Sequence, residues 1–186
     1  GRLNIWSLMN FSSLANNCQN TSYPFTSAGV VNTPGNTCGG ETQRLHLIEG
    51  EVERVASSML GQLDGGLNLG TAARNLRARA FSEFLRGMSL GYLAMVYDSA
   101  AVITAATTGD DPAPLVYYTV VMDSAYAAFA RAITAANDPL ATATDGSGFP
   151  IPATWIPSPT SYTATEFVKL IPTSRAKFRA QVARTP

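Results

Sequence analysis

One pentapeptide in the chain has the residue types and spacing of a catalytic motif. Residues 87–91 are Gly-Met-Ser-Leu-Gly, the G-x-S-x-G pattern of a nucleophile elbow between a strand and a helix. That site also needs a histidine later in the chain, but the only histidine, His46, comes before Ser89. The surrounding residues have the periodicity of one long helix. We therefore interpret Gly87, Ser89 and Gly91 as helix-packing residues and His46 as a structural residue.

Other side chains that could do chemistry form no catalytic or metal-binding pattern. Asp110 and Asp111 are neighbours in a loop-like segment, which suits a helix cap better than an acid–base pair, because glycosidase carboxyl groups lie about 5–9 Å apart. Glu49, Glu51 and Glu53 would point to different faces of a helix. A zinc site needs four ligands, and one histidine does not complete the set. We expect no enzyme, no metal and no cofactor.

The two cysteines, Cys18 and Cys38, lie in a polar segment rich in Asn, Thr, Gly and Pro. A disulfide between them would stabilise the fold by about 3 kcal/mol in the chain-entropy model. It would also indicate an oxidising compartment. We expect the disulfide, with two unpaired thiols as the alternative.

Two tryptophans are the candidate ligand-binding residues. Trp6 and Trp155 lie in irregular segments outside the helical patterns. An indole can cover the apolar face of a sugar ring while neighbouring polar side chains bond the sugar hydroxyls. The candidate platforms are Trp6 with Asn4 and Asn10, and Trp155 with Thr154 and Tyr162. The alternative is that both tryptophans fix loops onto the helical core.

Composition limits the class of protein. Of 186 residues, 46% are apolar, and the 13 basic side chains balance the 13 acidic ones, so there is no electrostatic signature of nucleic-acid binding. No apolar run approaches the length of a membrane span. The first residues lack the pattern of a signal peptide. We expect a processed or partial chain whose targeting or lipid-anchor segment lies outside it.

The elements are all predicted to be helical, because no segment shows sustained alternation of apolar and polar residues. Residues 1–40 form a loop-rich N-terminal segment with a short helix near residues 5–14, and residues 41–186 form the helical domain. The first long helix covers residues 41–63. Its expected apolar face consists of Leu45, Ile48, Val52, Val55 and Met59.

A second helix, capped by Thr71, is expected to continue to about residue 103, with Gly87 and Gly91 allowing another helix to approach closely. Its expected apolar face consists of Phe81, Leu85, Met88, Tyr92 and Met95 or Val96.

A loop at residues 107–114 precedes a third helix. Its expected seam is Leu115, Tyr118, Met122, Ala125, Phe129 and Ile133. A long irregular connection follows at residues 137–162, and Thr163 with Glu166 is the capping box of a fourth helix. Pro172 is expected to interrupt that helix, which resumes at residues 174–184 with Phe178 and Val182 pointing inward.

Several of these segments occur in an order that resembles the TPR-like core of SusD/RagB proteins, the nutrient-binding lipoproteins of the bacterial outer membrane. The first is residues 77–98, RARAFSEFLRGMSLGYLAMVYD. The second is the helix at 117–136 with its alanine-rich end, and the third is Phe-Pro-Ile-Pro-Ala-Thr-Trp at 149–155 before the helix at 169–184. The resemblance covers roughly residues 41–186.

The resemblance implies an all-α fold of TPR-like repeats with long irregular loops. It also implies a cell-surface protein that captures oligosaccharides or peptides without cleaving them. Such a protein is a lid on a TonB-dependent SusC-like barrel and is held at the outer membrane by a lipid anchor. The alternative is a cell-surface or periplasmic helical-repeat protein with a structural or adaptor role in an extracellular assembly.

Overall fold

A computed structural model describes residues 39–142, 147–156 and 160–181, and the side chains from residue 43 onward. The chain separates into two units, Gly1–Leu47 and Ile48–Pro186. Several sequence predictions lie outside the described residues. These are the helix near residues 5–14, Asn4, Trp6, Asn10, Val182 and the pairing of Cys18 with Cys38.

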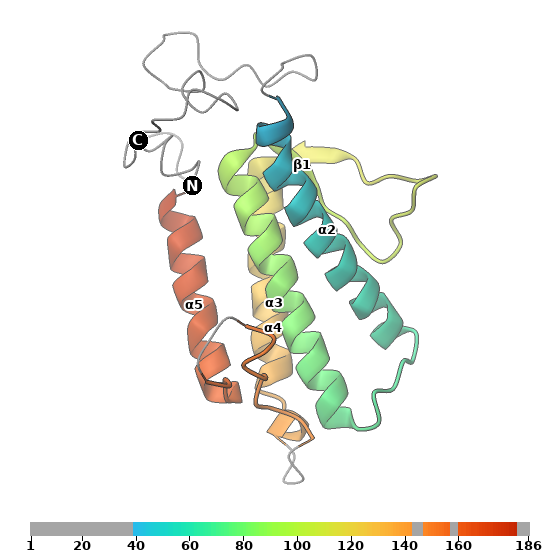
Figure 1. Cartoon of the computed structure of the whole chain (residues 1–186), viewed down its shortest axis with the longest axis vertical. Helices are drawn as coiled ribbons and strands as arrows, with labels where there is room; N and C mark the ends of the chain where they lie inside the picture. The colour runs from blue at the N-terminus through green and yellow to red at the C-terminus, as the bar shows by residue number, and fades with distance from the viewer. Residues whose placement is uncertain (1–38, 143–146, 157–159, 182–186) are drawn as a thin grey trace. The chain divides into compact units, whose positions relative to one another are not determined.

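The described part of the chain is mostly helical, as predicted (Figure 1). Its elements are α2 (Gly39–Asp64), α3 (Ala72–Val96), β1 (Ser99–Ala101), β2 (Leu115–Tyr117), α4 (Tyr118–Ala136), the 3₁₀ turn η1 (Pro139–Thr142) and α5 (Ala164–Gln181). In the second unit, α3 packs against both α4 and α5, and the core lies among these three helices.

Two short strands replace predicted helix. α3 ends at Val96 instead of continuing to residue 103, because Tyr97 adopts an extended conformation at its C-cap. β1 and β2 then pair antiparallel, with Ala100 opposite Val116. Leu115 therefore lies in a strand and not at the start of the third helix. Three-residue strands are too short to show a period of two, and their partner lies across a loop, so the sequence pattern does not reveal them.

The predicted helix starts at Thr71 and Thr163 are confirmed. Thr71 Oγ1 accepts a hydrogen bond from the backbone N–H of Arg74 at 3.2 Å. Thr163 and Glu166 make both bonds of a capping box, with the Thr163 N–H donating to Glu166 at 2.9 Å. The bonds that the Thr163 N–H and hydroxyl donate to the Glu166 carboxylate lower the pKa of Glu166. Asp110 and Asp111, in contrast, do not cap α4, whose N-cap is Tyr117.

Pro172 does not interrupt the last helix. α5 is continuous from Ala164 to Gln181 with Pro172 inside it. A proline removes one backbone donor and crowds the preceding turn. Here Phe167, Ile171 and Phe178, on both sides of the proline, have no exposed surface. Their burial holds the two halves of α5 in one helix.

Aromatic rings fill the core where α3 carries glycine. Phe129 of α4 and Phe178 of α5 are stacked, with ring centroids 6.2 Å apart. A Cβ atom at Gly87 would lie 2.7 Å from the Phe129 ring, and one at Gly91 would lie 2.5 Å from the Phe178 ring. The prediction that these glycines permit a close approach to α3 is confirmed. The groups that approach are the rings of Phe129 and Phe178.

The predicted apolar face of α2 is wrong at two of its five residues, and the other three are half-buried. Ile48 and Val55 are 47% and 69% exposed. The residues that α2 buries are Glu53, Ala56, Ser57, Leu60 and Leu63. The predicted seam of α4 is better, because Met122, Ala125 and Phe129 are all buried. On α3 the predicted face is only partly buried, since that helix is covered on several sides.

Candidate functional site

The segment that carries Trp155 is fixed to the helical domain by polar contacts along its length. Ser147 shares a hydrogen bond with Thr71, the N-cap of α3, at 3.0 Å. Arg77 of α3 donates to the carbonyl of Gly148 at 2.6 Å. Phe149 donates its N–H to Ala141 of η1 at 3.0 Å. The irregular segment therefore has a defined position on α3.

Trp155 lies against the first half of α3 and keeps 43% of its surface exposed. Its ring centroid is 5.2 Å from that of Phe81, and the Arg77 guanidinium lies 5.3 Å from the indole centroid. A cation above an indole is attracted by the ring quadrupole. Trp155 is thus held in one orientation with open surface remaining, so it could meet a flat apolar ligand surface such as a sugar face. The alternative prediction, that it fixes a loop to the core, is also consistent with these contacts.

Tyr162 is joined to this segment through its backbone. Ile151 and Tyr162 exchange two hydrogen bonds, at 2.7 and 3.0 Å. The Tyr162 side chain is half-buried and packs against the core. Within the described ranges no ring contact joins Trp155 and Tyr162. The structure therefore brings the two segments together without assembling a two-ring platform.

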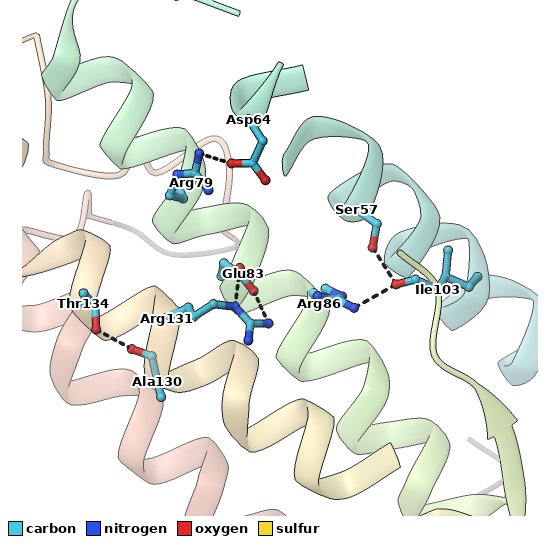
Figure 2. A network of polar contacts seen from close by, with 9 residues as sticks. All are labelled: Ser57, Asp64, Arg79, Glu83, Arg86, Ile103, Ala130, Arg131 and Thr134. Atoms are coloured by element: carbon cyan, nitrogen blue, oxygen red, sulfur yellow. Dashed lines mark hydrogen bonds and ion pairs between the residues drawn. The ribbon is translucent and has the colours of Figure 1, made fainter. Parts of the chain in front are cut away.

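A buried polar network that the sequence analysis did not predict lies where the loop after β1 meets α2 and α3 (Figure 2). The N–H of Ile103 donates to Glu53 Oε1 at 2.6 Å. The carbonyl of Ile103 accepts from Ser57 at 3.0 Å and from Arg86 at 2.9 Å. One peptide segment is thus held by three side chains from two helices.

Charge in this network is only partly compensated. Glu53 has no exposed surface, and its second oxygen, Oε2, has no hydrogen-bond partner among the described residues. Burial raises the pKa of Glu53 to about 7, against the opposing effects of the Ile103 N–H and of Arg86. Burial likewise lowers the pKa of Arg86. Glu49, half-buried one turn earlier on α2, also has its pKa raised to about 7 by burial.

A second buried carboxylate joins α3 to α4. Arg131 donates two bonds to Glu83, from Nε to Oε1 at 2.6 Å and from its terminal nitrogen to Oε2 at 3.1 Å (Figure 2). Glu83 is buried, whereas the Arg131 side chain is half exposed. This fork geometry is the strong form of a carboxylate–guanidinium pair.

The polar contacts join the loop after β1 to α2 and α3, and join α3 to α4. Glu53 and Glu83 are both buried, and each faces an arginine or a backbone donor of its own chain. Ser89, the serine of the G-x-S-x-G pattern, lies in the middle of α3, as predicted, and donates to the backbone carbonyl of Glu49. The sequence prediction spreads Glu49, Glu51 and Glu53 over different helix faces, but Glu49 and Glu53 are four residues apart and share one face, and that spacing is the signal it missed.

Within the described ranges no three His, Cys, Asp or Glu side chains are placed to hold a metal ion. None of the described helices combines the length and the hydropathy that crossing a membrane requires. Comparison of the chain with protein-family models, curated proteins and solved structures finds no match. The function must therefore be argued from the residues themselves.

Proposed function

We propose that this chain is a non-enzymatic nutrient-binding protein of the SusD/RagB type. It captures an oligosaccharide or peptide at the bacterial cell surface, as a lid on a TonB-dependent SusC-like barrel. Anchorage at the outer membrane through a lipid belongs to this proposal. The TPR-like arrangement of the helices belongs to this proposal.

The observation that carries the proposal is the position of Trp155. Its indole is held by Phe81 and Arg77, and 43% of the residue stays exposed. Aromatic side chains that are rigid and half exposed contribute contact area at low cost in conformational entropy. The segment around Trp155 is the one whose Phe-Pro-Ile-Pro-Ala-Thr-Trp order contributes to the resemblance.

A second candidate function is a structural or adaptor role in an extracellular assembly. Three apolar side chains near the start of α4, Leu115, Tyr117 and Val120, are exposed close together in the sequence. Exposed apolar residues that cluster are typical of surfaces that contact other proteins. This structural or adaptor role requires no small-molecule ligand.

Mild-detergent extraction of native outer membranes, followed by capture of this chain, distinguishes the two functions. The uptake role predicts that a large β-barrel comes with the chain in about equal amount, and that the captured complex binds glycans or peptides. Trp155→Ala should weaken that binding about tenfold or more, while Trp6→Ala tests the predicted platform outside the described residues. Recovery of copies of the chain alone, or of soluble partners alone, would overturn the uptake role.

A further inference from the structure

A groove between α4 and α5 has the size and the chemistry of a small-ligand site. Its volume is about 500 Å³, within the range of about 300–1,000 Å³ typical of such sites. The lining residues are Asp123 and Tyr126 from α4, with Pro172, Arg175, Ala176 and Arg179 from α5. Pro172 and Ala176 have short side chains, which leaves space between the longer polar ones.

The two arginines of the groove have no anionic partner in the described part of the chain. Arg175 and Arg179 are four residues apart, so they lie on one face of α5. The ion pairs among described residues are those of Arg79 with Asp64 and of Arg131 with Glu83. Two unpaired guanidinium groups side by side favour an oxyanion, which a planar fork can bind through two oxygens.

Tyr126 contributes its aromatic ring to the lining of the groove. The hydroxyl of Tyr126 is buried and has no hydrogen-bond partner among the described residues. Arg175 lies above the Tyr126 ring, 5.5 Å from its centroid. The ring therefore holds Arg175 beside the groove, whereas the buried hydroxyl has no surface through which a ligand in the groove could reach it.

Asp123 restricts the class of anion. A carboxylate on the opposite wall repels a simple anion but accepts hydrogen bonds from hydroxyl groups. A ligand that satisfies Asp123, Arg175 and Arg179 therefore carries one anionic group and at least one hydroxyl. Building on the proposed function, we infer that the α4–α5 groove binds the acidic unit of a carbohydrate, with a sugar carboxylate at Arg175 and Arg179 and a sugar hydroxyl at Asp123.

Titration calorimetry of the full chain with a trimeric uronic acid oligosaccharide, and with a neutral hexose trimer of the same length, tests this assignment. We expect the uronate to bind at least about tenfold more tightly than the neutral trimer, and to weaken as salt is added. Arg179→Gln should remove that preference. Lys169→Gln is the matched control, because it removes one exposed cation of α5 outside the groove and should leave the preference unchanged.

Equal affinity for the two trimers, or equal loss of affinity in the two variants, would overturn the inference. So would binding of a dipeptide at this groove with none of the uronate. The ligand assignment for the groove and the proposed function can be overturned independently of each other. If Trp155→Ala abolishes glycan binding while Arg179→Gln changes nothing, the groove is wrong and the uptake role stands. If uronate binding depends on Arg179 but no β-barrel is captured from membranes, the uptake role is wrong and the groove stands.

Discussion

The ring of Phe178 occupies the position that a side chain on Gly91 would need. A Cβ atom at Gly91 would lie 2.5 Å from Cε2 of that ring. Phe178 has no exposed surface, and it contacts Tyr92 edge-on at 5.2 Å between centroids while stacking on Phe129. The ring therefore has little space into which it can move.

Alanine at Gly91 or Gly87 is expected to destabilise the fold. Overpacking a filled core costs about 1–3 kcal/mol, which exceeds the gain of about 1 kcal/mol that alanine brings to a helix interior. We expect a net loss of up to roughly 2 kcal/mol in the free energy of unfolding, measured by urea denaturation. Gly50→Ala in α2 is the control, because no described atom lies within 4 Å of a Cβ there. It should stabilise by up to about 1 kcal/mol, and equal gains at Gly50 and Gly91 would contradict the packing argument.

The ion pair between Glu83 and Arg131 predicts a graded loss of stability in a series of variants. Arg131→Ala leaves the Glu83 carboxylate buried without its two donors, and should destabilise by roughly 1–3 kcal/mol. The stability of Arg131→Lys should fall between that of the native chain and that of Arg131→Ala, because an ammonium group keeps the charge but cannot donate the two parallel bonds of a guanidinium. In a double-mutant cycle with Glu83→Gln, thermal or chemical denaturation should show that the two losses are not additive. Additive losses would mean that the pair contributes no coupling energy.

The predominance of helix could be predicted from the sequence because it depends on local signals. Thr71, and Thr163 with Glu166, start helices through bonds to residues three positions away, and such spacing is visible in a single sequence. The seam of α4 was predictable for the same reason. Its buried residues Met122, Ala125 and Phe129 follow the helical period.

The buried face of α2 could not be predicted, because the burial of Glu53 depends on a distant partner. Periodicity places apolar Val52 and Val55 inward, whereas the structure half-buries Val52, leaves Val55 exposed and buries Glu53. The donor to Glu53 is the N–H of Ile103, 50 residues later, in a loop that the sequence suggested was helix. Without that contact a buried carboxylate would be too costly to expect.

The bracing of Trp155 by Arg77 predicts a measurable change in indole exposure. Arg77→Ala removes the bonds to Gly148 and Pro150 and the cation near the indole. In a Trp6→Phe background, acrylamide should then quench Trp155 fluorescence more strongly, with a loss in stability of about 1 kcal/mol. Arg74→Ala is the control, because Arg74 is exposed and bonds the carbonyl of Leu69 instead. If both variants quench alike, Arg77 does not position the indole.

The raised pKa of Glu53 predicts that the free energy of unfolding falls as the pH rises. Its pKa is raised from 4.5 to about 7 by burial, so between these values the folded chain binds more protons than the unfolded chain. The free energy of unfolding therefore decreases as pH rises through this window, by on the order of 3 kcal/mol from this group.

Glu53→Gln should remove that slope, since an amide stays uncharged and its oxygen can still accept from the Ile103 N–H. The variant should match the native chain in stability near pH 4.5, and exceed it above pH 7 by up to about 3 kcal/mol. Urea denaturation at a series of pH values measures the difference. Glu51→Gln, on the exposed side of the same helix, is the matched control and should keep the native pH dependence. A difference between Glu53→Gln and the native chain that does not vary with pH would show that Glu53 is ionised throughout. The other charged groups that face it, Arg86 and Arg54, would then outweigh its burial.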